Sequence, residues 1–143
     1  MMKKISIKIS LLIFLIFSST NANAGAYGKG ELKLSPDVTD WFIEYIKGKL
    51  TKSPGIFYVT TDGGGAYYWY CEYGAGNCQF ESFQQMELEC ERAYQTDCKA
   101  FARARIIKWK NGINPGKGKI SKINSRLSDT EIKNQLRDLG FID

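Results

Sequence analysis

The sequence contains no histidine, and this absence excludes several kinds of active site. Ser-His and Cys-His nucleophile systems need an imidazole as the general base, so neither can form here. Carboxylates are present, but a pair such as Glu87 and Glu91 has the four-residue spacing of an ordinary helix surface. No motif for a cofactor stands out either. The sequence therefore predicts a protein that is not an enzyme and that binds no cofactor.

Long apolar runs are also lacking, except for one near the N-terminus. Residues 11–17 are all apolar, three lysines precede them, and an Ala-x-Ala pattern ends at Ala24. This layout is typical of a cleavable secretory signal peptide. The apolar run is shorter than the roughly 20 residues that a membrane-spanning helix needs. We expect residues 1–24 to be the signal peptide and the rest to be exported to the periplasm or the medium.

Acidic residues are missing from one long segment. Removing residues 1–24 removes three lysines and no acid, so the net charge falls from +5 to +2. The basic character of the precursor is therefore no argument for nucleic acid, and export argues against such a partner. Residues 99–126 nevertheless contain no acid and nine basic residues, which are Lys99, Arg103, Arg105, Lys108, Lys110, Lys117, Lys119, Lys122 and Arg126. Such a segment is either a solvated basic surface or a contact for an anionic envelope component.

Cysteine is scarce but occurs in an even number. The four cysteines are Cys71, Cys78, Cys90 and Cys98. In a small exported domain an even count predicts disulfides, here two. The gaps between the cysteines are too long for a zinc knuckle, so no metal site is expected. Three pairings are open, and we favour Cys71–Cys78 with Cys90–Cys98 because each closes a short local loop.

Three helices are predicted from cap signals that precede apolar residues spaced three and four apart. Ser35 before Pro36 starts the first helix, and Ser82 starts the second. Ser128 starts the last helix, where Glu131 three residues later completes a capping box.

Strands are predicted where β-branched and aromatic residues gather. Residues 53–55 predict a turn, after which 56–61 and 66–71 form two strands joined by the glycine-rich connection 62–65. Residues 99–110 alternate and predict one bent strand or a tight hairpin. The fold expected is α+β, with a small antiparallel sheet of three or four strands, packed helices and two disulfides.

The sequence also suggests how the mature chain is divided. Residues 25–112 are expected to form a disulfide-stabilised domain. Its first part, residues 25–34, is expected to be a loose leader. Residues 113–126 are polar and rich in glycine and lysine, which predicts a basic linker to a C-terminal helix over 127–143. Truncation after Asn114 is then expected to leave a folded domain.

Four residues are predicted to form a binding surface. In the run 67–70, Tyr68 and Tyr70 point to one face of a strand. This face either is buried or offers an aromatic platform for a sugar ring or a peptide. Arg103 and Arg105 also fall on one side of a regular strand. We expect Tyr68, Tyr70, Arg103 and Arg105 to be the binding residues.

Residues 68–112 resemble a recurrent pattern in small, uncharacterised exported bacterial proteins. The matching pieces are Tyr70-Cys71, Cys78, the helix that ends in Cys90-Glu91-Arg92, Cys98-Lys99-Ala100-Phe101-Ala102, and Ile107-Lys108-Trp109-Lys110-Asn111-Gly112. Residues 136–141 are similar to the tail of such proteins. The resemblance implies an envelope protein and no particular activity.

Two functions are compatible with these features. The first is a non-enzymatic exported binding module for an anionic envelope polymer, glycan or lipid surface. The alternative is a protein-interaction or inhibitor module of the bacterial envelope. In that case the C-terminal helix or the glycine-rich loops would contact another envelope protein, and an exposed apolar stripe on the helix would favour this function.

Overall fold

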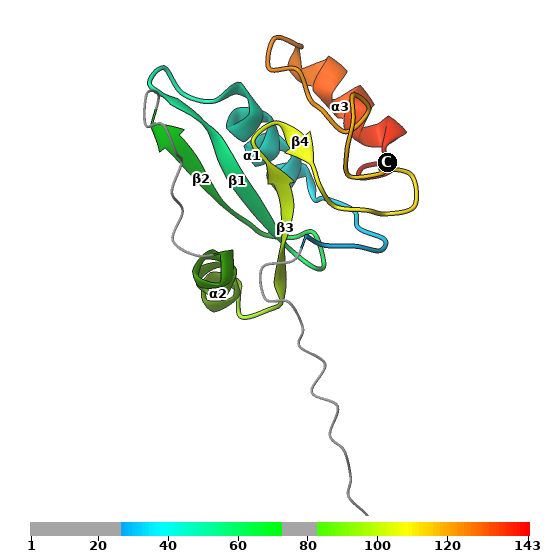
Figure 1. Cartoon of the computed structure of the whole chain (residues 1–143). Helices are drawn as coiled ribbons and strands as arrows, with labels where there is room; N and C mark the ends of the chain where they lie inside the picture. The colour runs from blue at the N-terminus through cyan, green and yellow to red at the C-terminus, as the bar shows by residue number, and fades with distance from the viewer. Residues whose placement is uncertain (1–26, 73–82) are drawn as a thin grey trace, which may run out of the picture.

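A four-stranded antiparallel sheet forms the centre of the protein (Figure 1). The computed structural model describes residues 27–72 and 83–143. The sheet has the order β2-β1-β3-β4, with β1 at Lys52–Thr60, β2 at Ala66–Glu72, β3 at Cys98–Arg103 and β4 at Ile106–Ile107. The helices are α1 at Pro36–Lys47, α2 at Phe83–Tyr94 and α3 at Asp129–Asp138. The predicted α+β class with an antiparallel sheet is confirmed.

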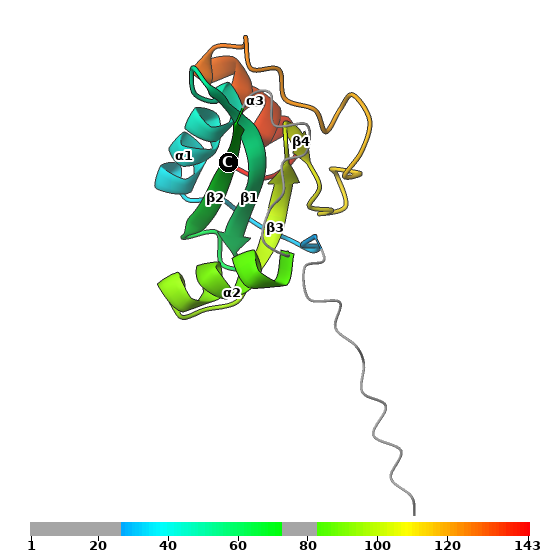
Figure 2. The same cartoon turned by 60° about the vertical axis from the view of Figure 1, so that its left-hand side comes forward.

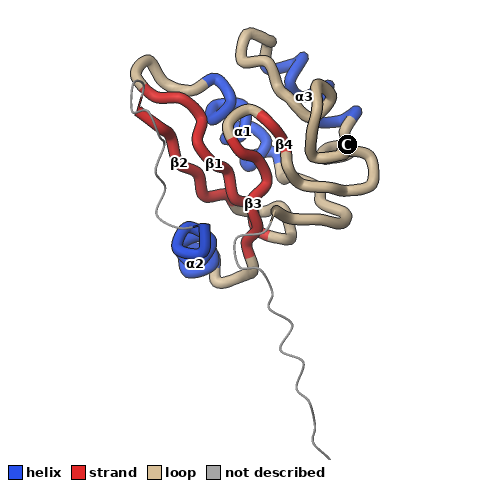
Figure 3. Tube along the Cα trace, viewed as in Figure 1, coloured by secondary structure: helices blue, strands red, loops and turns tan. Residues whose placement is uncertain are grey.

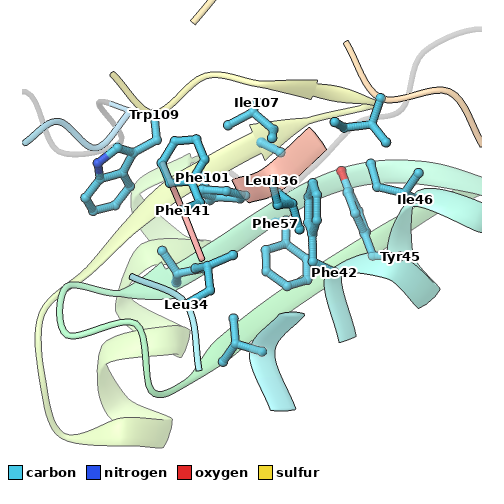
Figure 4. Close-up of a cluster of buried hydrophobic side chains, with 14 of the residues drawn as sticks. Leu34, Phe42, Tyr45, Ile46, Phe57, Phe101, Ile107, Trp109, Leu136 and Phe141 are labelled. Carbon is cyan, nitrogen blue, oxygen red and sulfur yellow. The ribbon is translucent and has the colours of Figure 1, made fainter. Parts of the chain in front are cut away.

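The helices lie on both faces of the sheet (Figures 1 and 2). Helices α1 and α3 pack on one face, where the larger apolar cluster lies (Figure 4). In this cluster Phe57 of β1 and Phe101 of β3 both contact the ring of Phe42 from α1. Helix α2 covers part of the other face, where Met86 packs with Tyr58. The sheet is therefore the middle layer of three.

Local capping explains where α1 and α3 begin, as the sequence predicts. The hydroxyl of Ser35 accepts a hydrogen bond from the Val38 N–H at 3.3 Å. At α3 the side chain of Ser128 and that of Glu131 each accept from the other residue's backbone N–H, which is a complete capping box. The hydrogen bond from the Ser128 N–H holds the pKa of the Glu131 carboxyl below its usual value. The start of α2 falls next to Ser82, which lies outside the described residues.

The predicted turn at residues 53–55 is wrong, because β1 runs through it from Lys52 to Thr60. A shift of register between Pro54 and Ile56 absorbs the proline and glycine without ending the strand. The hairpin after β1 is confirmed, and Asp62 organises it. Its carboxylate accepts from the Thr60 hydroxyl at 2.6 Å and from the Gly64 N–H at 2.9 Å. These bonds lower the pKa of Asp62.

Residues 98–107 form a tight hairpin of β3 and β4, one of the two expected forms. Ala104 adopts a left-handed φ of 48° at the bend, and the hydroxyl of Tyr45 donates to its carbonyl at 2.9 Å. A second irregularity lies earlier in β3, where Phe57 pairs with Ala102 and Tyr58 pairs with Ala100. Phe101 is therefore an extra residue in the strand. Each side chain after Phe101 points to the face of the sheet opposite to the one that regular alternation would give it.

One of the two expected disulfides is present and joins Cys90 of α2 to Cys98 of β3. Both cysteines are fully buried, so the bond fixes α2 against the sheet. Cys78 lies outside the described residues, and so does the expected pairing Cys71–Cys78. The part of the chain that the structure describes contains no free cysteine.

The segment 113–126 is a loop between β4 and α3 (Figure 3). It is packed against the protein, although the sequence suggests a polar linker. Asn114, Ser121 and Ile123 are buried in it. The helix that follows places its apolar residues in the main core, which they share with Phe101 and Phe42 (Figure 4). The expectation of a loosely attached C-terminal helix is therefore revised. Local composition suggested a linker because the segment is polar and rich in glycine, whereas its polar residues Asn114 and Ser121 are buried and hydrogen-bond each other and the carbonyls of Ile107 and Trp109.

Candidate functional site

The two tyrosines predicted to bind a ligand lie at the edge of the core. Tyr68 stacks on Phe57 with ring centroids 5.1 Å apart, and both Tyr68 and Tyr70 lie 6.0 Å from the ring of Tyr45. Burial, with a contribution from the Tyr68 hydroxyl, raises the pKa of Tyr70 to about 12. The exposed ring of this strand is Trp69 on the opposite face, with 52% of its surface accessible.

The two arginines predicted to act together point to opposite faces of the sheet. Arg105 donates from Nε to the Ile46 carbonyl at the end of α1, at 2.9 Å. Arg103 lies over the ring of Phe83 in α2, 5.5 Å from its centroid. Ala104 lies between the two arginines at the bend of the hairpin, with a left-handed φ of 48°, so Arg103 and Arg105 do not belong to one regular strand. Tyr68, Tyr70, Arg103 and Arg105 therefore do not form one surface.

A basic cavity of about 460 Å³ lies elsewhere, and we call it the lysine pocket. Its lining residues are Tyr27, Gly28, Lys29, Lys108, Lys110, Pro115, Gly116 and Lys117. Four of these are lysines and none is acidic. Lys108 places Nζ 6.0 Å from the centroid of the Tyr27 ring, so one ammonium group lies against an aromatic wall.

The first wall of the lysine pocket is the segment 27–30. It runs parallel to its neighbours, with Tyr27 bridged to Ala100 and Lys29 bridged to Lys110. The Gly28 N–H donates to the Ala100 carbonyl at 3.0 Å, and the Gly28 carbonyl accepts from the Lys110 N–H at 3.2 Å. These bonds place the side chains of the segment beside those of residues 108–110. The expected loose leader is in this part an ordered wall.

Residues 115–117 form the second wall of the lysine pocket. Gly116 has a φ of +72°, and a Cβ atom there would lie 2.7 Å from the Lys108 carbonyl oxygen. Only glycine therefore fits this close approach. Next to it, the buried Asn114 amide donates to the carbonyls of Ile107 at 3.1 Å and Trp109 at 2.6 Å. The hydroxyl of Ser121 donates to Asn114 Oδ1 at 2.6 Å, so a buried hydrogen-bond network supports this wall.

The charges of the lysine pocket are not neutralised by nearby acids. Among the described residues, no ion pair involves Lys29, Lys108, Lys110 or Lys117. Other lysines do pair with a carboxylate, namely Lys33, Lys47, Lys52, Lys99 and Lys133. Four like charges around one cavity repel each other, and a bound anion would relieve that repulsion.

A second cavity differs from the lysine pocket in that its charged side chains are paired. It measures about 320 Å³, and its lining includes Lys133 and Asp143. Both charges are already paired, since Lys133 contacts Asp40 at 2.8 Å and Asp143 contacts Lys33 at 2.9 Å. This cavity has no excess of one charge and gives no reason for an ion to bind.

The sequence pointed to three of the four lysines of the lysine pocket. Lys108, Lys110 and Lys117 belong to the acid-free segment that composition identifies. Lys29 and Tyr27 come from a segment whose composition suggests only a loose leader. Their place depends on a parallel pairing with residues about 75 positions later, and no local pattern in a sequence reports such a pairing.

Other kinds of site find little support within residues 27–72 and 83–143. No group of three or more potential metal ligands occurs in these ranges. No helix within the same two ranges is long and apolar enough to cross a membrane. A comparison with known proteins found no matching family model, curated protein or solved structure.

Proposed function

We propose that the protein is an exported, non-enzymatic binding module for an anionic polymer or glycan of the bacterial envelope. The observation that carries this proposal is the lysine pocket, where four lysines without an ion-pair partner among the described residues surround one cavity. The cavity is large enough for part of a ligand, since small-molecule sites measure roughly 300–1,000 Å³. The proposed site therefore moves from the pair Arg103 and Arg105 to the lysine pocket.

The geometry favours a polymer that enters the site from the surface. Three of the lysines, Lys29, Lys110 and Lys117, are exposed, so their ammonium groups remain accessible to solvent. Their backbone is held firmly, since Lys110 is paired to Gly28 and Gly30 through main-chain hydrogen bonds. A rigid base that carries accessible cations suits a ligand with several spaced negative charges.

The alternative is a protein-interaction module, and the exposed apolar stripe that would have favoured it is not present on α3. Helix α3 would have to present an apolar stripe to a partner. Its apolar residues Ile132 and Leu136 are fully buried in the protein's own core, and Leu139 after them is 2% exposed. The helix therefore presents mainly polar side chains to solvent, and the anionic ligand remains the better proposal.

Replacing two lysines of the pocket tests the proposal directly. The variant Lys108→Gln with Lys110→Gln should bind dextran sulfate about tenfold more weakly than the wild type at low salt, because two of the four charges are gone. Neutral dextran should not bind either protein. The matched control is Lys49→Gln with Lys52→Gln, which changes the net charge equally at the distant start of β1 and should bind like the wild type. Equal binding by the pocket variant and the wild type would refute the proposal.

Export predicts that the second disulfide, Cys71–Cys78, also forms. The purified protein, unfolded but not reduced, should then contain no reactive thiol, and after reduction it should contain four. Thiol titration measures both states, and mass mapping should find a peptide that links Cys71 to Cys78. Two reactive thiols before reduction would show that the second bond is absent.

A further inference from the structure

We infer that the lysine pocket recognises its ligand through phosphate groups rather than through carboxylates. This inference rests on the proposed function, because it names the chemical class of the anion that the same site binds. It follows from the type of cation in the pocket, from the arrangement of the charges and from the size of the cavity.

The pocket contains lysines and no arginine. A guanidinium group is a planar fork that matches the two oxygens of a carboxylate, whereas an ammonium group is a compact point charge with three donors. The chain does contain arginines, but Arg103 and Arg105 are held by Phe83 and Ile46 away from the pocket. The site therefore lacks the group that reads carboxylate geometry and should respond to charge density.

Charge density separates the two kinds of anion. A phosphate monoester carries about −1.5 to −2 charges at neutral pH on three acceptor oxygens, whereas a carboxylate carries one charge on two oxygens. The lysines come from separate segments of the chain, with Lys29 and Lys110 on paired segments and Lys117 on the loop at residues 115–117. One phosphate group can accept from several ammonium groups at once, whereas one carboxylate neutralises fewer of them.

The size of the cavity indicates that the phosphate is attached to a larger molecule. A cavity of about 460 Å³ falls within the range for organic ligands and leaves room beside a single phosphate. Tyr27 provides an apolar wall for that part of the ligand. Its ring is fixed by an edge contact to Phe83, with centroids 6.2 Å apart. A sugar that carries a phosphate monoester, either alone or as a side group on a polymer, has both of the required features.

Three anionic derivatives of glucose test this inference by chemical-shift titration. Glucose 6-phosphate concentrates about two charges on one group, glucarate spreads two charges over two carboxylates, and glucuronate carries one. We expect glucose 6-phosphate to bind about tenfold more tightly than glucarate, with shifts at Lys29 and Gly116. The preference should disappear in Lys108→Gln with Lys110→Gln and persist in Lys49→Gln with Lys52→Gln. If the monosaccharides bind too weakly, dextran that carries phosphate monoesters and carboxymethyl dextran with the same number of anionic groups replace them.

The results separate this inference from the proposed function. Equal affinity for phosphate and carboxylate ligands, both lost in the pocket variant, would overturn the phosphate inference and leave the proposed function intact. Failure of every anion to bind, dextran sulfate included, would overturn both. Vesicles of phosphatidylcholine with phosphatidic acid distinguish the source of the phosphate. Competition by these vesicles supports a phosphate on a lipid headgroup, whereas glucose 6-phosphate binding without vesicle binding supports a phosphate on a soluble ligand or polymer.

Discussion

Truncation after Asn114 is expected to abolish cooperative unfolding of the protein. The deletion removes five buried apolar side chains, which are Ile123, Ile132, Leu136, Leu139 and Phe141. Phe141 also packs edge-on against Phe101 of β3, with ring centroids 4.9 Å apart (Figure 4). Burying each such side chain contributes about 1.5–3 kcal/mol, so the loss is on the order of 10 kcal/mol. A whole domain is stable by only about 5–15 kcal/mol.

Urea titration followed by circular dichroism measures the effect of the truncation. The control is a chain that ends at Phe141, which loses only the partly exposed Ile142 and the exposed Asp143. This control gives up the ion pair of Asp143 with Lys33, which is exposed and contributes little. It should therefore unfold cooperatively at nearly the wild-type midpoint. A cooperative transition of the Asn114 truncation with a wild-type slope would mean that residues 27–114 fold independently.

The sequence predicts correctly those elements whose causes are local. The Ser35 cap and the Ser128–Glu131 capping box each depend on residues within one helical turn. The hairpin at Asp62 depends on hydrogen bonds to residues two positions away. The disulfide between Cys90 and Cys98 closes a short loop. None of these features needs information from a distant part of the chain.

The errors have two different causes. The extra residue Phe101 in β3 is accommodated between Phe57 and Tyr58 of another strand, and it places Arg103 on the opposite face of the sheet from Phe101. An alternating pattern cannot report such a bulge, because the pattern looks the same with or without it. The segment 113–126 looks like a linker for another reason, because composition counts its polar residues as exposed to solvent. Its polar residues Asn114 and Ser121 hydrogen-bond each other and the main chain inside the protein.

The lysine pocket was in part predicted from a local signal and in part missed. The acid-free segment supplied a correct local signal, since Lys108, Lys110 and Lys117 all belong to it. What the sequence did not provide was the grouping of these residues with Lys29 and their separation from Arg103 and Arg105. That grouping follows from the pairing of residues 27–30 with 100 and 110, so the pocket depends on this contact.

Gly28→Ala is expected to destabilise the protein and to weaken anion binding at the same time. A Cβ atom at position 28 would lie 2.0 Å from two carbons of the Trp109 ring. The ring cannot easily move away, because it is 2% exposed and its Nε1 donates to the Gly30 carbonyl at 2.8 Å. Overpacking of this kind costs about 1–3 kcal/mol. The strain should separate residues 27–30 from Lys110, and the pocket should then lose its Tyr27 and Lys29 wall.

Urea unfolding and dextran sulfate binding together test this coupling, with Gly30→Ala as the matched control. Gly30 lies two residues away, and a Cβ atom at this position would meet no other atom within 4 Å, although the φ of +96° adds backbone strain. Its variant should therefore keep more of the binding. In a Trp109→Phe background the smaller ring leaves space at position 28. Gly28→Ala should therefore lower the free energy of unfolding clearly less in that background than in the wild type. Equal costs in the two backgrounds would show that the contact with Trp109 does not hold the segment. Loss of stability with unchanged binding would show that the wall at residues 27–30 takes no part in holding the anion, and the ligand would then contact only Lys108, Lys110 and Lys117.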